Sequence, residues 1–363
     1  AISLSTMIGN TNNGLHFTSG SSSNTVDESY MRGNNQGLLV DIGCNFTAIT
    51  VSTMIGINSP GLYLSSADSN TVTDSYMWSS LSYGADIGNG SDYNTISYST
   101  MIGNTASGFT AFGGDYNTVT RSYMQGVAKG AWLDAAARFD TISFSTMVSI
   151  SNSVGNPGLY INSASSNTIL NSLIKGATGA YILSSTGTVI GNSILIATNT
   201  AGAALALGGG SVNLRVSSSI LTSVFMSTGS TPLYLDANNK GWLVFSTNTM
   251  IGGQYGAYIA TQTAGTQVWL SSNTILVHST GTIATYGLYV NGLMFGATIQ
   301  NNGIYYRRSG PVSALGTTAF YAKTTDGIVF ERNRINNPGM ITTGGFIGVD
   351  LYGADNMIFR YND

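Results

Sequence analysis

Residues 2–7 read I-S-L-S-T-M, and this hexapeptide returns with small changes every 23 or 24 residues as far as Met147. Each copy has an apolar residue, two variable residues, Ser, one variable residue and Met. The copies end at Met7, Met31, Met54, Met77, Met101, Met124 and Met147. Self-similarity at a fixed period marks a repeat architecture in which each unit packs on its neighbours. The period of the repeat therefore decides the fold.

Beyond Met147 the hexapeptide continues with steps of 20 to 31 residues, which indicates inserted loops. The Ser position becomes Asn in several of these copies: Asn192, Asn248, Asn273, Asn302 and Asn333. A second short segment recurs between the hexapeptides, as G-L-Y-L at Gly61 and G-A-Y-I at Gly179. Alternating apolar residues after a turn glycine are typical of short strands. We therefore expect an all-β fold, a right-handed single-stranded parallel β-helix of about 14 coils of roughly 23 residues.

The register predicts which residues form the core. One inward column is Ile2, Val26, Ile49, Val72, Ile96, Val119 and Ile142, and the Met residues form another. A turn Asn recurs before Thr, and stacked Asn side chains can hydrogen-bond to the neighbouring coil; these are Asn24, Asn70, Asn94, Asn117 and Asn167. Copies that begin with Ile end in S-T-M, and copies that begin with Val end in S-Y-M. The two kinds alternate strictly up to Met147, so the duplicated unit is two coils.

The composition excludes several classes of protein. Only 8% of the residues are charged and the net charge is −3, so there is no basic surface for nucleic acid. No apolar run approaches the length of about 20 residues that spans a membrane. Cys44 is the single cysteine, which rules out a disulfide framework and a thiolate metal cluster. We expect no nucleic acid partner and no membrane insertion.

A single domain over residues 1–363 is predicted, with regular two-coil repeats in 1–147, looser coils in 148–300, and longer, more charged coils in 301–363. The chain begins and ends inside a repeat, and we expect it to be a stretch of something longer or a unit that stacks end to end. The expected partners are other β-helix units or copies of itself.

These repeats resemble those of the pectin-lyase-like superfamily of right-handed parallel β-helices, over essentially the whole chain. The resemblance implies the fold, and a role among lyases, hydrolases, epimerases, tailspikes, adhesins and surface proteins. The N-T-D, D-D, G-H-G and R-I-K motifs of polygalacturonase-like members are absent, as is a pectate-lyase-type W-x-D-H segment. Their absence argues against those two activities.

One column of charged residues is a candidate for chemistry. Asp68, Asp92 and Asp115 precede the turn Asn on three consecutive coils, and Arg138 follows on the next. Carboxylates about 5 Å apart can bind Ca²⁺ or, with an Arg, cleave an acidic polysaccharide. The structural alternative is that each Asp caps its turn. No other cofactor is expected, and Asp41 and Asp134 are interpreted as structural residues at strand ends.

Aromatic residues mark two candidate binding surfaces. Tyr30, Tyr76 and Tyr123 are expected to point outward at intervals of two coils, where they can stack on sugar rings or pack against another rod. Tyr305, Tyr306, Arg307 and Arg308 lie in one of the longest coils, and aromatic and Arg side chains on inserted loops are common in binding sites.

Two functions are compatible with these features. The uniform repeats and low charge favour an extracellular or cell-surface rod with a structural or adhesive role, which binds glycans or forms filaments. The alternative is a polysaccharide lyase or glycoside hydrolase that acts on an acidic polysaccharide. We favour the rod over the enzyme, because the coils that carry the Asp column have almost no inserted residues to form a groove.

Overall fold

The computed structural model describes residues 1–88, 90–134, 137–224, 229–279, 284–292, 295–308, 317–336 and 346–363. The chain is an all-β parallel solenoid of about 13 turns, each about 25 residues, with three parallel sheets, A, B and C. No helix occurs among the described residues, so none of these residues forms a helix that could span a membrane. The predicted parallel β-helix is confirmed, and inserted residues make its turns slightly fewer and longer than predicted.

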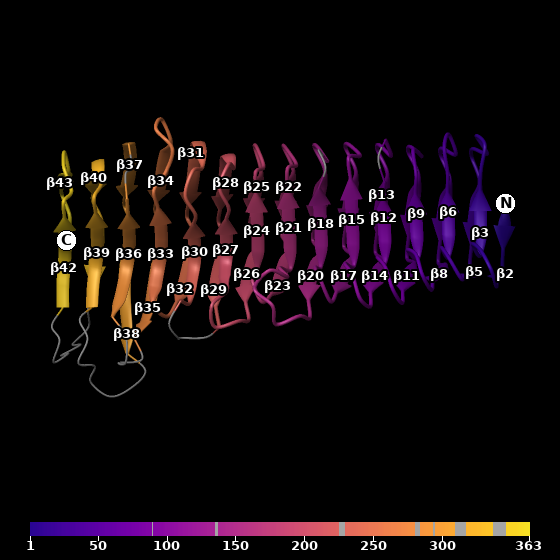
Figure 1. Ribbon diagram of the computed structural model, residues 1–363, viewed down its shortest axis with the longest axis horizontal. Coiled ribbons are helices and arrows are strands. Elements are labelled where there is room, and N and C mark those ends of the chain that lie inside the picture. Colours follow the sequence, from indigo (N-terminus) through magenta and orange to yellow (C-terminus); the bar gives the residue numbers. More distant parts are fainter. Residues whose placement is uncertain are drawn as a thin grey trace. The chain divides into compact units, whose positions relative to one another are not determined.

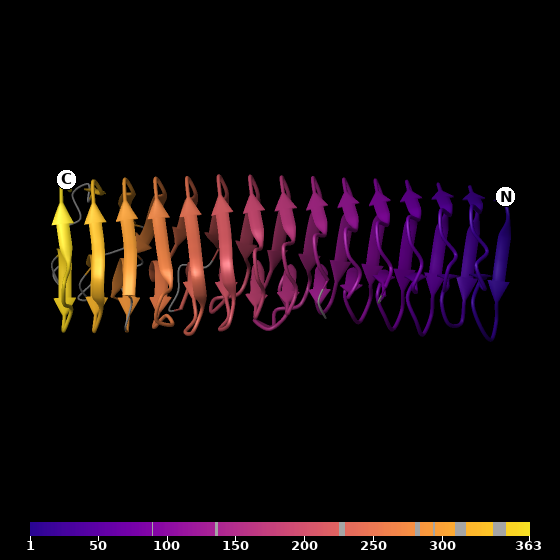
Figure 2. The ribbon, with the colours of Figure 1, turned by 90° about the horizontal axis from the view of Figure 1, so that it is seen from above.

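The solenoid divides into two compact units. Unit 1 comprises residues 1–151 and 156–176, and unit 2 comprises residues 152–155 and 177–363. Within each unit, one strand from each sheet makes up a coil, and equivalent strands of successive coils lie side by side (Figures 1 and 2).

The strands of unit 1 are short, with two to four residues each. Sheet A contains β1 (Ile2–Ser3), β4 (Thr25–Asp27), β7 (Ala48–Thr50), β10 (Thr71–Thr73), β13 (Thr95–Ser97), β16 (Thr118–Thr120), β19 (Thr141–Ser143) and β22 (Thr168–Leu170). Sheet B contains β2 (Thr6–Gly9), β5 (Tyr30–Gly33), β8 (Thr53–Gly56), β11 (Tyr76–Ser79), β14 (Thr100–Gly103), β17 (Tyr123–Gly126), β20 (Thr146–Ser149) and β23 (Leu173–Gly176). Sheet C contains β3 (Leu15–Phe17), β6 (Leu38–Val40), β9 (Leu62–Leu64), β12 (Ala85–Ile87), β15 (Phe109–Phe112), β18 (Ala131–Asp134) and β21 (Leu159–Asn162).

Many strands of unit 2 are longer, with up to seven residues. Sheet A contains β25 (Val189–Gly191), β28 (Val212–Ser217), β31 (Lys240–Ser246), β34 (Gln267–Ser271), β37 (Phe295–Gln300), β40 (Asp326–Glu331) and β43 (Ile358–Arg360). Sheet B contains β26 (Ile194–Ala197), β29 (Ile220–Ser223), β32 (Thr249–Gly252), β35 (Thr274–Ser279), β38 (Gly303–Arg308) and β41 (Arg334–Asn336). Sheet C contains β24 (Ala180–Leu183), β27 (Ala203–Leu207), β30 (Thr231–Leu235), β33 (Tyr255–Ala260), β36 (Thr285–Asn291), β39 (Thr317–Lys323) and β42 (Phe346–Tyr352).

The predicted core columns are confirmed. The Met residues pair in register from Met7 to Met147, and all from Met31 onward are buried. The Ile and Val residues pair in register from Ile2 to Ile142. Alternation along each strand turns every second side chain inward, so the two columns fill the interior between sheets A and B.

The Ser residues of successive hexapeptides form a hydrogen-bonded ladder at the corner between sheets A and B. The backbone N–H of Ser52 donates to Oγ of Ser75 in the next coil (3.1 Å), and Ser75 Oγ donates to the Thr73 carbonyl (2.8 Å). The same inter-coil bond runs from Ser5 to Ser172 in unit 1. In unit 2, Asn takes over from Ser, through Asn248, Asn273, Asn302 and Asn333. The residue before each corner has a left-handed backbone, even Val51 (φ 47°), a strained conformation for a β-branched residue.

The sequence pattern that takes Asn192 as the Ser position places its hexapeptide at residues 189–194, and the structure shifts this copy by one residue. Ile190 pairs with Val216 and Leu195 with Leu221, so this copy spans 190–195. Ser193 therefore occupies the corner, where its N–H donates to Ser219 Oγ (3.2 Å), and Asn192 is the preceding left-handed residue (φ 50°). A slip of one residue exchanges the inner and outer faces of a strand, which is why the pattern of apolar residues alone misplaced it.

The predicted Asn ladder lies at a second corner, just before sheet A. In unit 1 each backbone N–H donates to the side-chain oxygen one coil on, from Asn70 to Asn94 and from Asn94 to Asn117 (2.8 and 2.9 Å). Asp140 replaces Asn in the same column and accepts the N–H of Asn117 (2.8 Å). Asn94 Nδ2 also donates to the Ala67 carbonyl (2.9 Å), whereas Asp140 Oδ2 has no hydrogen-bond partner. A carboxyl group therefore occupies a position that suits an uncharged amide.

Burial raises the pKa of Asp140 to about 7. The hydrogen bonds with Asn117 lower the pKa, but by less than burial raises it. An acid whose pKa is higher in the folded state favours folding while it is protonated. Its contribution is complete below about pH 4 and is lost as the pH rises through about 7. We expect Asp140→Asn to raise the free energy of unfolding at pH 7.5 by a few kcal/mol, with little effect at pH 4. Thermal melting across this pH range measures the difference.

Asn94→Asp is the matched variant, because it puts a second carboxyl group into the same buried column. It should destabilise the protein at pH 7.5 and less so at pH 4. Equal melting temperatures of Asp140→Asn and the unsubstituted protein at both pH values would contradict this role of the ladder.

Candidate functional site

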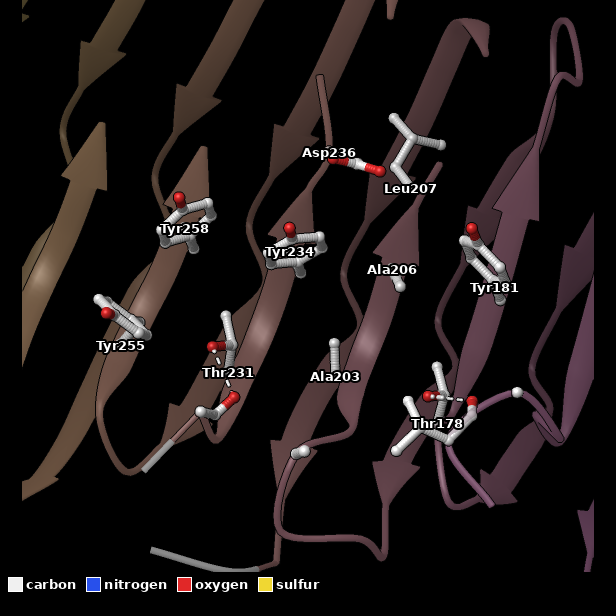
Figure 3. Close-up of a pocket in the computed structure, with 14 residues that line it drawn as sticks. Thr178, Tyr181, Ala203, Ala206, Leu207, Thr231, Tyr234, Asp236, Tyr255 and Tyr258 are labelled. Carbon is white, nitrogen blue, oxygen red and sulfur yellow. Dashed lines mark hydrogen bonds between the residues drawn. The ribbon is translucent and has the colours of Figure 1, made fainter. Parts of the chain in front are cut away.

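A cavity of about 540 Å³ opens on the outer face of sheet C in unit 2 (Figure 3). Its walls come from strands β24, β27, β30 and β33, and from loop residues that include Val154, Ala201 and Gly229. The volume is within the range of small-molecule sites, which are mostly apolar with a few polar groups. The lining of this cavity is likewise mostly apolar, with a carboxylate and a few hydroxyl groups.

Stacked tyrosine rings form a ladder on the outer face of sheet C, and its first two members, Tyr234 and Tyr258, line the cavity. Tyr234, Tyr258, Tyr289 and Tyr321 occupy the same outward position on β30, β33, β36 and β39. Neighbouring rings have centroids 5.1, 5.2 and 4.8 Å apart, with interplanar angles between 9° and 19°. We call these four residues the tyrosine ladder. The strand spacing of the coil sets the distance between its rings.

The ladder is interrupted by one small residue. Tyr234 pairs with Ala206, and Ala206 pairs with Tyr181, so all three share one column across three consecutive coils. Figure 3 shows the rings of Tyr181 and Tyr234 on either side of Ala206. Two strand spacings separate the Tyr181 and Tyr234 backbones, about 9.6 Å. We call the space above Ala206, between these two rings, the slot.

Asp236 provides a carboxylate at the rim of the slot. Its Oδ1 accepts the Ala237 N–H (2.8 Å), and Oδ2 receives no hydrogen bond from the described residues. Burial raises the pKa of Tyr181 and of Tyr234, and the negative charge of Asp236 raises both further. Both phenols therefore stay protonated at neutral pH and can donate hydrogen bonds.

The other end of the cavity carries two hydroxyl groups. Thr178 Oγ1 donates to the Val154 carbonyl (3.0 Å), and Thr231 Oγ1 donates to the Gly229 carbonyl (3.2 Å). Their lone pairs remain to accept hydrogen bonds from a ligand. The loop residues on this side are fixed by Asn199, whose Nδ2 donates to the Asn152 carbonyl (2.6 Å).

Gly208 makes room for the Tyr181 ring. A Cβ at Gly208 would lie 2.8 Å from the Tyr181 hydroxyl and 2.6 Å from Leu183 Cδ1. The next coil carries Asp236 at this position, since Leu207 pairs with Leu235 and each precedes it by one residue. Gly208 therefore leaves space for the Tyr181 ring, and the next coil places the Asp236 carboxylate at the equivalent position.

A second group of polar and aromatic residues lies on the outer face of sheet C in unit 1. Asp86 is only 9% exposed and accepts a hydrogen bond from Thr110 Oγ1 (2.8 Å). Burial raises the pKa of Asp86 to about 6, and the Thr110 hydroxyl opposes the shift. Tyr63 and Trp132 continue the column on either side of this pair.

A second carboxylate, Asp134, lies near this group. It accepts a hydrogen bond from Asn162 Nδ2 (2.8 Å). Burial, followed by the charges of Asp86 and Asp134, raises the pKa of Tyr83. Lys129 Nζ is 4.0 Å from the centroid of the Trp132 ring, and burial lowers its pKa while Asp134 opposes that change. Asp134, interpreted from sequence as a strand-end residue, thus belongs to a charged group with aromatic walls.

The Asp column is assembled as predicted, and its carboxylates bond to the backbone. Asp68 Oδ1 accepts the N–H of Asp92 (2.9 Å), and Asp92 Oδ1 accepts the N–H of Asp115 (2.8 Å). Arg138 binds both carboxylate oxygens of Asp115 (3.2 and 2.8 Å). Asp68 and Asp92 therefore cap the backbone of the next coil and not their own turns, whereas Asp115 pairs with the Arg138 side chain.

No group of three or more His, Cys, Asp or Glu side chains in the described part of the chain is arranged to hold a metal ion. The Ca²⁺ site at Asp68, Asp92 and Asp115 stays a prediction.

Tyr30, Tyr76 and Tyr123 lie on sheet B with one Thr between each pair, at the predicted interval of two coils. Tyr76 is 37% exposed and the other two are partly exposed. Two strand spacings, about 9.6 Å, separate successive Tyr residues of this column. The sheet B column is therefore a row of separate rings, unlike the tyrosine ladder.

The C-terminal candidate surface is partly wrong. Tyr306 is fully buried, and its hydroxyl donates to the Thr318 carbonyl (2.8 Å), so it belongs to the core. Tyr305 is partly exposed on β38. The side chains of Arg307 and Arg308 lie outside the described residues.

Sequence reasoning missed Tyr181, Ala206, Tyr234, Asp236 and Asp86. A signal for the first three was present, since the recurring G-A-Y-I and G-L-Y-V segments place Tyr at one position of the second strand. Ala206 is an exception in that column, within A-A-L-A-L at residues 203–207. Reading the outward positions of sheet C as a column would have shown both the ladder and its interruption.

No family model matches the chain, and no curated protein matches it. Solved structures do match, and the chain is similar to β-helix enzymes and adhesins among them. DFA-IIIase from Arthrobacter chlorophenolicus A6 is 11% identical, over 77% of this chain and 82% of that one, with a TM-score of 0.43. PfbA, a surface adhesin of Streptococcus pneumoniae, is 10% identical over 93% and 84%, with a TM-score of 0.39. Alginate lyase from Paenibacillus sp. str. FPU-7 is 15% identical over 93% and 99%, with a TM-score of 0.35.

Proposed function

We propose that the protein is a glycan-binding β-helix whose binding site is the cavity on the outer face of sheet C in unit 2. The observation that carries this proposal is the pair of tyrosine rings, Tyr181 and Tyr234, that line the cavity on either side of Ala206, with Asp236 beside them. A sugar ring has apolar C–H faces that pack on aromatic rings, and hydroxyl groups at its edge that need hydrogen-bond partners. The slot offers both kinds of surface.

The wider proposal is a structural or adhesive rod that acts outside the cell or on its surface. Uniform coils, a charged fraction of 8% and a cavity with aromatic walls suit a scaffold that holds a glycan. Assembly with other β-helix units or with copies of itself belongs to the same proposal.

Replacing Tyr234 by Ala should weaken the binding of a soluble oligosaccharide at least about tenfold, because it removes one wall of the slot and its stacking energy. Isothermal titration of the intact chain with hexasaccharides of glucose, mannose, xylose and galacturonic acid measures the effect. Tyr76→Ala is the control, since it removes an exposed Tyr on sheet B and should leave binding unchanged. Binding that depends on Tyr76 and not on Tyr234 would place the site on the sheet B column instead.

A polysaccharide-cleaving enzyme is the second candidate function. The Asp86 carboxyl favours it, because a group with a pKa of about 6 can both give and take a proton near neutral pH. Asp134 is the second carboxylate of this group, and Trp132 and Tyr63 provide aromatic walls. Asp86 is thus a better candidate acid than the Asp column, in which Asp68 and Asp92 accept backbone hydrogen bonds and Asp115 pairs with Arg138.

Incubation with neutral and acidic polysaccharides, with and without Ca²⁺, tests for cleavage through new reducing ends or unsaturated products. On the binding proposal we expect no cleavage by the unsubstituted protein. Cleavage that is lost in Asp86→Asn and kept in Asp92→Asn would make the protein an enzyme with its site on sheet C. The reverse pattern would place catalysis on the Asp column.

A further inference from the structure

We propose that the slot binds one uncharged pyranose ring, which takes the place of the missing rung in the tyrosine ladder, and that Ala206 is the residue that determines this specificity. The inference rests on the proposed function, glycan binding in this cavity, and adds the class of ligand. It follows from the spacing of the slot, the polar groups at its ends and its charge.

The spacing fits one ring. Rings on consecutive coils of the ladder stack with centroids 4.8 to 5.2 Å apart. Tyr181 and Tyr234 are separated by twice the strand spacing, about 9.6 Å, because Ala206 occupies the coil between them. A six-membered ring inserted halfway would therefore lie about one strand spacing, 4.8 Å, from the position of each Tyr. A longer side chain at position 206 would fill this space.

The polar groups favour a sugar over an aromatic ring. Asp236 and the hydroxyl groups of Tyr181 and Tyr234 lie at one end of the slot, and Thr178 and Thr231 lie at the other. A pyranose has hydroxyl groups around its whole edge and can bond at both ends while its faces pack on the rings. An aromatic side chain would displace water from these polar groups without replacing its hydrogen bonds, which costs binding energy.

The charge of the slot selects against acidic sugars. Asp236 is negative, and of the described residues that line the cavity none is Lys or Arg. The carboxylate of a uronic acid would meet a like charge with no cation to offset it, in a partly buried space where charge repulsion is screened less than in water. A neutral hexose or pentose donates its hydroxyl groups to Asp236 without this cost. The slot is therefore matched to neutral polysaccharides and not to pectate or alginate.

Ala206→Tyr tests the slot directly, because it completes the ladder. We expect it to lower the affinity for the best neutral hexasaccharide at least about tenfold and to keep or raise the melting temperature through two new ring stacks. Ala206→Ser is the matched control, which leaves the slot open and should bind within about twofold of the unsubstituted protein. Ala206→Leu fills the slot without a ring and should also block binding, so the test does not depend on one variant.

Asp236→Asn tests the charge. In the unsubstituted protein, neutral hexasaccharides should bind at least about tenfold more tightly than hexagalacturonate, and the substitution should narrow this ratio. Titration of the intact chain with these ligands also distinguishes a failure of the proposed glycan binding from a failure of the proposed slot. If no hexasaccharide binds, the proposed function fails. If neutral glycans bind equally to the Ala206→Tyr and Ala206→Leu variants, glycan binding stands and the slot is wrong. Tighter binding of hexagalacturonate, or of p-cresol as a probe for an aromatic ring, overturns the class of ligand.

Discussion

The hydrogen bond from a corner backbone N–H to a side-chain oxygen of the next coil is the interaction on which the structure depends. Short strands, of two to seven residues, offer few ladder bonds each, and the chain must turn sharply between them. Each corner exposes a backbone donor that the sheets cannot pair, and a buried donor without a partner is costly. Ser satisfies it in unit 1 and at the start of unit 2, and Asn satisfies it in the later coils, as between Ser52 and Ser75 or Asn248 and Asn273. Ser and Asn therefore recur in the sequence because each corner N–H needs a side-chain acceptor from the next coil.

Because the corners and the inward columns hold the coils in register, the outward side chains are free to vary. An outward residue contacts mainly the equivalent residues one coil before and one coil after, so each outward position forms an independent column. A uniform column such as the tyrosine ladder presents a flat surface, whereas a change of residue size opens a space of defined width. Ala206 makes such a space beside Tyr234, and Asp86 with Thr110 makes a polar one beside Tyr63. Both sites are interruptions of columns on sheet C.

The fold and its core could be predicted from sequence because the repeat aligns equivalent residues directly. The alignment of the Met residues and the stacking of Asn94 on Asn117 both follow from spacing. The burial of Tyr306 also follows from alternation, since Ile304 points inward two residues before it, but the interpretation of this coil as an exposed loop concealed it. The environment of Asp86 could not be predicted, because its pKa depends on how deeply the folded chain buries the carboxyl group. The slot depends on a residue that is small and uncharged, and such a residue carries no chemical signal of its own.

A crystal structure of the protein with a bound neutral hexasaccharide would test the central claim most directly. The account predicts density for one pyranose ring between Tyr181 and Tyr234, parallel to both rings and with its hydroxyl groups toward Asp236. Density along the Tyr30, Tyr76 and Tyr123 column on sheet B, with the slot unoccupied, would contradict it.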